Sequence, residues 1–139
     1  PGPQRILDAD DAELRAAGVS AAKAATLRRA GEAVASGALT ETMLDERSSA
    51  DAALALRSIK GIGPWTATVI LLRGLGRLDV FPGGDSSVAA NLALVAGADV
   101  DAAEAAEMLG SQRGMLYFHL LLARLEARGE VGRPSAVSG

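Results

Sequence analysis

Apolar residues recur at helical spacing along most of this chain, in short segments separated by glycine, proline and small polar residues. Between Ser20 and Gly37, for example, apolar residues recur near helical spacing at Ala21, Ala25, Leu27, Ala30 and Val34. Serine, threonine and aspartate before such segments are typical helix N-caps, and the glycines after them are typical stops. The pattern predicts helices over residues 11–17, 20–37, 40–46, 49–57, 64–72, 86–96, 101–109 and 112–128.

The composition favours an all-α fold. Ala, Leu, Arg and Glu dominate, whereas residues that favour strands are scarce and only four residues are aromatic. There is no internal repeat and no sign of a second domain. We therefore expect an irregular orthogonal helical bundle over residues 1–129, followed by a flexible tail at 130–139 in which Gly, Pro and Ser predominate.

Missing residue types exclude several classes of chemistry. The chain has no cysteine, which excludes iron-sulfur clusters, cysteine-ligated zinc and thiol catalysis. With a single histidine, a metal site would need carboxylates or backbone oxygens. No apolar run approaches the roughly 20 residues of a membrane span, and no charged and then apolar leader opens the chain. We expect no membrane partner and a cytoplasmic protein.

The charge is unevenly distributed. The net charge of −3 argues against a nucleic-acid partner, because such proteins are usually basic. The stretch from Leu54 to Leu78 nevertheless holds four basic residues and no acid: Arg57, Lys60, Arg73 and Arg77. A local basic site therefore lies on an acidic protein.

The same stretch contains the most informative motif, Ile59-Lys60-Gly61-Ile62-Gly63, between two predicted helices. This is a helix-hairpin-helix pattern. Its glycines permit positive φ and the close approach of a phosphate, and the N–H groups that begin the second helix form an anion site. An ordinary glycine-containing turn explains so short a pattern about equally well, and Lys60 is readily explained as a solvated side chain.

The longer string from Leu56 to Leu94 closely resembles the helix-hairpin-helix (HhH-GPD) DNA glycosylase superfamily. After the hairpin come Trp65, the run Asp79-Val80-Phe81-Pro82 and then Asp85, in the family's order and spacing. The stretch from Arg113 to Leu120 is similar to the family's closing helix. The group it resembles most is that of the bacterial 3-methyladenine DNA glycosylases II.

The resemblance implies a monofunctional enzyme of base excision repair. Such an enzyme flips an alkylated purine out of double-stranded DNA and hydrolyses its N-glycosidic bond. Asp85 would be the carboxylate that stabilises the oxocarbenium-like sugar, and Asp79 the family's structural acid with no catalytic part. Judged without the resemblance, Asp85 is more simply the N-cap of the helix at 86–96.

The resemblance also assigns binding residues. Trp65 stands where family members that nick the strand carry a Schiff-base lysine, and it would line the base pocket; packing in the core is the alternative. The DNA backbone would be bound by Lys60, Gly61, Gly63 and Arg113. No cofactor is required, although the carbonyls of Arg57, Ile59 and Ile62 would hold a monovalent cation, Na⁺ or K⁺.

Two departures from the family leave alternatives open. Gln112 stands where the family has an aromatic residue, and the several helices that begin family domains are missing. Their absence predicts an exposed apolar face, covered by a homodimer or by a missing N-terminal segment. The chain alone is then not certain to be active. A non-catalytic helix-hairpin-helix DNA-binding module and an alanine-rich interaction domain are the other readings; a bacterial glycosylase would reside in the cytoplasm with the nucleoid.

Overall fold

The computed structural model describes residues 2–84, 86–97 and 99–129. Throughout these ranges the regular structure is helical and no β-strand occurs, which confirms the prediction of an all-α fold. Contacts between residues group the chain into two compact units, Pro1–Ala67 and Thr68–Gly139. Each unit is described by itself, and the predicted tail at 130–139 lies outside the described residues.

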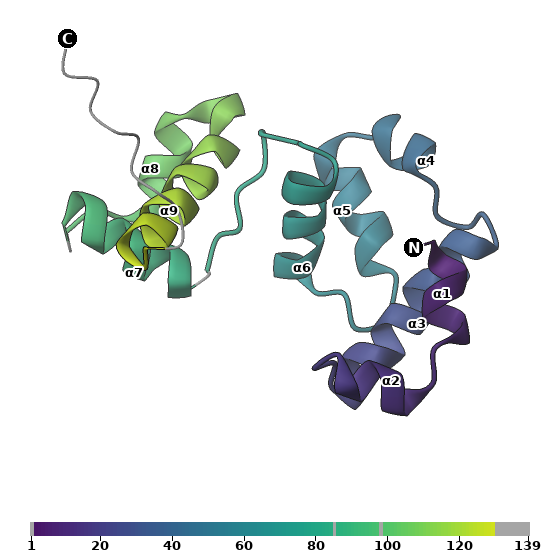
Figure 1. Ribbon diagram of the computed structural model, residues 1–139. Coiled ribbons are helices and arrows are strands. Elements are labelled where there is room, and N and C mark those ends of the chain that lie inside the picture. Colours follow the sequence, from purple (N-terminus) through teal and green to yellow (C-terminus); the bar gives the residue numbers. More distant parts are fainter. Residues whose placement is uncertain (1, 85, 98, 130–139) are drawn as a thin grey trace, which may run out of the picture. The chain divides into compact units, whose positions relative to one another are not determined.

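The first unit consists of helices that, apart from α1, begin within one residue of where the sequence predicts. They are α1 (Pro3–Asp8), α2 (Asp11–Ala16), α3 (Ala21–Ala35), α4 (Glu41–Asp45), α5 (Ser49–Arg57) and the start of α6 (Pro64–Val69) (Figure 1). Side chains of Asp10, Ser20, Thr40 and Ser48 cap four of them by accepting a backbone N–H three residues ahead. Polar caps and glycine stops therefore determine most of the helix boundaries.

Helix α1 is the exception, since it was not among the predicted helices. It has six residues, begins with Pro3 in its first turn and packs on α3. The contact is close at Gly31, where an added Cβ would lie 3.3 Å from Leu7 Cδ2 and 3.6 Å from the Pro3 carbonyl oxygen. A helix this short is marginal in isolation, so packing on α3 stabilises it.

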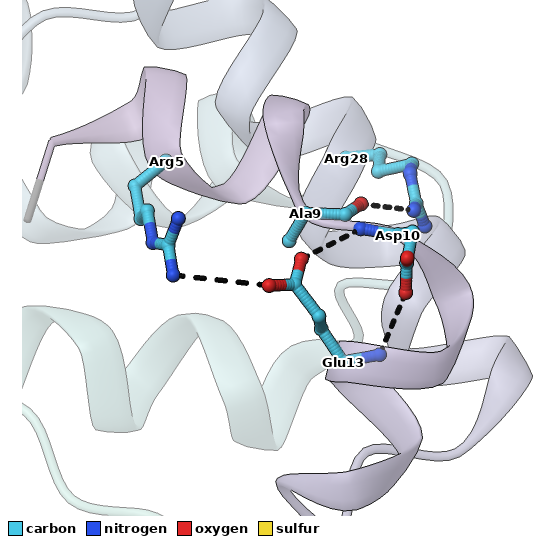
Figure 2. A network of polar contacts seen from close by, with 5 residues as sticks. All are labelled: Arg5, Ala9, Asp10, Glu13 and Arg28. Carbon is cyan, nitrogen blue, oxygen red and sulfur yellow. Dashed lines mark hydrogen bonds and ion pairs between the residues drawn. The ribbon is translucent and has the colours of Figure 1, made fainter.

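A polar network fixes the turn between α1 and α2 (Figure 2). Asp10 and Glu13 form a capping box, in which each carboxylate accepts the backbone N–H of the other residue, at 2.8 and 3.1 Å. Arg28 of α3 donates to the Ala9 carbonyl at 2.8 Å, and its guanidinium is 3.0 Å from an Asp11 carboxylate oxygen. These contacts hold the start of α2 against α3.

The described residues of the second unit form three α-helices and two irregular turns. Its elements are a π-helical turn (Ile70–Gly74), α7 (Ser86–Ala96), α8 (Ala102–Met108), a 3-10 turn (Gly110–Gln112) and α9 (Gly114–Ala127). The predicted helix at 64–72 thus becomes π-helical after Val69. The helix predicted at 112–128 begins later than expected, because the preceding residues form the 3-10 turn.

The core of the second unit joins α7 and α9. Val88, Leu92 and Leu120 are buried, and Phe81 and Tyr117 pack against them. Next to this cluster, Pro82 is fully buried. The loop that leads to Asp85 is therefore anchored by apolar packing just before that residue.

Several large apolar side chains of the second unit are exposed. Leu94 is 78% exposed, Val95 61% and Leu122 48%. Leu94 and Val95 line a hollow of about 260 Å³ between α7 and α9, together with Arg124. In the ranges described, no helix combines the length and the apolar character needed to cross a membrane.

Candidate nucleic-acid interface

The predicted hairpin is present between α5 and α6. Helix α5 ends when Ser58, its C-cap, donates its backbone N–H to the carbonyls of Leu54 and Leu56. The chain then turns through a hydrogen bond of 3.0 Å from the Ile62 N–H to the Ile59 carbonyl. Ala67 donates its N–H to the Gly63 carbonyl at 3.0 Å, which joins the hairpin to the first turn of α6.

Gly61 is at the tightest point of the hairpin. Its φ is +102°, a conformation that residues with a Cβ rarely adopt. A Cβ added there would collide with the Thr26 hydroxyl oxygen and lie 3.0 Å from both Cβ and Cγ2 of Thr26. Gly63 differs, because an added Cβ would meet no atom within 4 Å. Gly61 is thus required by the packing against α3, whereas Gly63 leaves open space on the hairpin.

Helix α3 also supports the hairpin through a polar contact. The Arg29 guanidinium donates to the Lys60 carbonyl oxygen at 3.2 Å. Thr26, one turn earlier, donates its hydroxyl to the Ala22 carbonyl at 3.1 Å and thereby turns toward its own helix. Neither residue was predicted to belong to the hairpin. Arg29 and Lys60 are 31 positions apart in the sequence, and a contact over that distance leaves no local signal.

The hairpin combines an apolar anchor with exposed positive charge. Ile62 is buried at 8% exposure, and Ile59 is half-buried. Arg57, Lys60 and Arg29 are exposed around them. The packing of Ile62 and Ile59 therefore fixes the turn, and the cationic side chains around it are exposed to solvent.

The carbonyls predicted to hold a cation lie within this turn. Carbonyl oxygens are hard ligands that suit Na⁺ or K⁺. The Ile59 carbonyl accepts the Ile62 N–H and keeps a second lone pair. Among the described residues, no group of three or more His, Cys, Asp or Glu side chains could bind a metal ion instead. The residues of the hairpin are therefore compatible with a monovalent cation held by backbone oxygens.

Trp65 lies in the first turn of α6, two residues after Gly63. Its side chain is 48% exposed. A tryptophan that packed only in a core would be largely buried, so the exposure argues against that alternative. Trp65 is therefore partly accessible to solvent.

Arg113 and Asp85 belong to the second unit. Arg113 precedes α9 as its N-cap residue, is half-buried and donates Nε–H to the Gly110 carbonyl at 2.8 Å. Asp85 lies outside the described residues, so its expected role as N-cap or catalytic carboxylate stays a prediction. In the sequence before Asp85, Phe81 packs against the core of the second unit and Pro82 is fully buried, and α7 begins at Ser86.

Similar sequences are DNA glycosylases by name. The chain is 38% identical over 89 residues to DNA-3-methyladenine glycosylase 1 of Schizosaccharomyces pombe, which is 63% of this chain and 39% of that protein. It is 35% identical over 85 residues to YfjP of Bacillus subtilis, whose name marks it as a candidate DNA-3-methyladenine glycosylase. That match covers 61% of this chain and 30% of YfjP. No protein-family model matches the chain.

Solved structures with the same fold include a DNA glycosylase bound to DNA. The 3-methyladenine DNA glycosylase Mag1 of Schizosaccharomyces pombe, in complex with abasic DNA, superposes with a TM-score of 0.76 at 26% identity, over 96% of this chain and 66% of Mag1. MBOgg1, in complex with a low-affinity DNA ligand, gives 0.72 at 22% identity, over 92% of this chain and 45% of MBOgg1. The second likeness concerns the fold alone. The chain spans less than half the length of the two relatives matched by sequence, DNA-3-methyladenine glycosylase 1 and YfjP.

Proposed function

Because this chain belongs to the helix-hairpin-helix DNA glycosylase superfamily, we propose that it is the part of a monofunctional DNA glycosylase that grips duplex DNA and carries the catalytic carboxylate. The substrate is an alkylated purine of the 3-methyladenine type. The reaction is hydrolysis of the N-glycosidic bond, which leaves an abasic site for the later steps of base excision repair.

One observation carries this proposal above the others. Nearly the whole chain superposes on Mag1, whose solved structure holds abasic DNA. Abasic DNA is what remains once a base has been released. The sequence match to a second protein named for 3-methyladenine supports the same substrate class.

The hairpin would bind the DNA backbone. Backbone N–H groups and the dipole of the helix that follows attract a phosphate without a basic side chain, and Lys60 adds positive charge. Open space at Gly63 allows a phosphate oxygen to approach the main chain. Arg113 would add a backbone contact from the second unit. This mode of binding is compatible with an acidic protein.

Release of an alkylated base requires only limited catalytic assistance from the protein. An alkylated purine carries positive charge and leaves readily, so a strong general acid is unnecessary. The developing charge on the sugar is oxocarbenium-like, and the Asp85 carboxylate would stabilise it electrostatically and assist the attacking water. Trp65 would stack on the extruded base with its exposed face. With Trp rather than Lys at this position, no Schiff base forms and the strand is not cut.

The backbone carbonyls of Arg57, Ile59 and Ile62 would hold a monovalent cation in the hairpin. The cation would neutralise part of the phosphate charge and stiffen the turn. Duplex affinity should then be higher in KCl or NaCl than in tetramethylammonium chloride at equal ionic strength. Equal affinity in all three salts would remove the cation from the proposal.

Base release from alkylated DNA tests the main proposal. Duplex containing 3-methyladenine or 7-methylguanine is incubated with the protein and then treated with hot alkali, which cuts at abasic sites. We expect cuts only after the alkali step. Asp85→Asn should abolish them and leave duplex binding nearly intact, whereas Asp99→Asn, a matched change at an exposed position, should have no effect. Full activity of Asp85→Asn would exclude Asp85 from the mechanism.

A non-catalytic DNA-binding module is the second candidate. It is favoured by Gln112, which stands where the resemblance places an aromatic wall of the base pocket, and which is exposed. Under this alternative the protein binds duplex in a salt-dependent way and releases no base from either lesion. The same incubation therefore distinguishes the two candidates.

A further inference from the structure

Two neighbouring arginines of α3 have different surroundings. The Arg28 guanidinium is 3.0 Å from an Asp11 carboxylate oxygen and donates to the Ala9 carbonyl at 2.8 Å. Its charge therefore stabilises the contact between α2 and α3. Arg29 is exposed, and its guanidinium donates to the Lys60 carbonyl oxygen at 3.2 Å. One arginine thus stabilises the first unit, and the other is held at the hairpin.

The charge of Arg29 is not balanced by an acid. Within the described part of the chain, neither Arg29 nor Lys60 takes part in an ion pair. A guanidinium has five N–H donors, and the contact with the Lys60 carbonyl uses only one of them. Arg29 at the hairpin and Lys60 within it are both exposed cations, and their positive charge would attract an anion.

We infer that Arg29 is a second phosphate-binding group of the hairpin, contributed by α3. The hydrogen bond to the Lys60 carbonyl places the guanidinium one residue before Gly61, where the DNA backbone would approach the main chain. The remaining donors of its planar fork match two phosphate oxygens. Hairpin N–H groups and Arg29 together would then bind the sugar-phosphate backbone of a duplex.

The packing of the hairpin on α3 supports this role. Gly61 is pressed against Thr26, one turn before Arg29 on the same helix. The hairpin therefore cannot move away from α3 without losing that contact, and Arg29 stays beside it. The inference rests on the proposed function, because it requires that the hairpin meets DNA.

Salt dependence of duplex binding tests the inference, since each phosphate neutralised contributes about 0.9 to the slope of log K against log salt concentration. The test uses an undamaged duplex and three variants: Arg29→Gln, Arg29→Lys and Arg15→Gln. Arg15 is an exposed arginine of α2 and serves as the matched control for loss of one positive charge.

We expect Arg29→Gln to lower the slope by about 0.9 and to weaken binding roughly tenfold. Arg29→Lys should keep the slope but bind several-fold more weakly, because a lysine cannot form the fork. Arg15→Gln should match the unmodified protein. If Arg29 only positioned the hairpin, Arg29→Gln would weaken binding at an unchanged slope, and that result would overturn the inference.

The outcomes separate this inference from the proposed function. An unchanged slope in Arg29→Gln, with base release intact in the unmodified protein, refutes only the role of Arg29. Failure of the unmodified protein to bind duplex refutes both. Should Arg29→Gln not fold, Arg29→Lys decides the matter, because undiminished affinity in that variant contradicts a phosphate contact through the fork.

Discussion

Replacing Gly61 by alanine should destabilise the protein through two separate effects. The φ of +102° at this position costs a residue with a Cβ roughly 1–2 kcal/mol. The new Cβ also lies 3.0 Å from Thr26 Cβ and nearer still to its hydroxyl oxygen, and overpacking of this kind costs about 1–3 kcal/mol. Rotating the Thr26 side chain would not remove the contact with its Cβ. Together we expect a loss of roughly 2–5 kcal/mol from the free energy of unfolding.

Urea unfolding followed by far-UV circular dichroism measures this loss, and Gly63→Ala provides the control. Gly63 has no positive φ, and its added Cβ meets nothing within 4 Å. Its replacement should change the free energy of unfolding by less than about 1 kcal/mol. DNA binding should nevertheless suffer, because the added methyl group would occupy the space where a phosphate approaches. Gly63→Ala should thus be stable and bind duplex poorly.

A double-mutant cycle separates the steric part from the backbone part. Thr26→Ala removes the hydroxyl and Cγ2, so Gly61→Ala should cost about 1–2 kcal/mol less in that background than in the unmodified protein. The remaining loss is the cost of positive φ together with the contact to the Cβ of residue 26, which alanine retains. Equal losses in both backgrounds would show that Thr26 does not constrain the hairpin, and a Gly61→Ala protein as stable as the original would refute both parts of the reasoning.

Two further predictions concern the second unit. Gly114→Ala should lower the melting temperature, with a loss of roughly 1–3 kcal/mol, because its Cβ would lie 2.9 Å from both Cα and the carbonyl oxygen of Leu78. Gly83→Ala, where an added Cβ meets no atom within 4 Å, should leave the melting temperature almost unchanged; equal melting of the two variants would contradict the packing argument. The exposed Leu94 and Val95 should cause self-association of this 139-residue chain, visible as a sedimentation coefficient that rises with concentration and weakened by Leu94→Ser. A monomer at every concentration would refute that expectation.

Local signals in the sequence were sufficient to predict most of the helices. Caps such as Ser20 and Thr40, and stops such as Gly37, act within a few residues, so they can be recognised in the sequence before the fold is known. Helix α1 has no side-chain cap at its start and was not predicted from the sequence. Packing on α3 stabilises it instead. The π-helical turn at Ile70–Gly74 and the 3-10 turn at Gly110–Gln112 were likewise not predicted.

Some parts of the candidate site could likewise be predicted from the sequence, and others could not. The hairpin was predicted from its glycines and confirmed as a turn with Gly61 at positive φ. Nothing in the sequence near Arg29 or Thr26 indicated that α3 lies beneath it, because that contact joins residues 31 positions apart. The roles of Asp85, Trp65 and Arg113 in base release and DNA binding stay predictions. Assays of base release and of duplex binding test them.

The adjacent positions of Arg28 and Arg29 restrict how α3 can change in length. Successive residues of an α-helix are separated by about 100° around its axis, so these two side chains leave the helix in different directions. Deleting one residue between Ser20 and Arg28 would bring Arg29 to the position beside Asp11, and inserting one would bring Arg28 to the position beside the Lys60 carbonyl. Either change leaves one of the two contacts without its arginine. Related chains should therefore tolerate insertions in the loop at 36–40 far better than within α3. The length of α3 thus couples the stability of the first unit to the proposed binding of DNA at the hairpin.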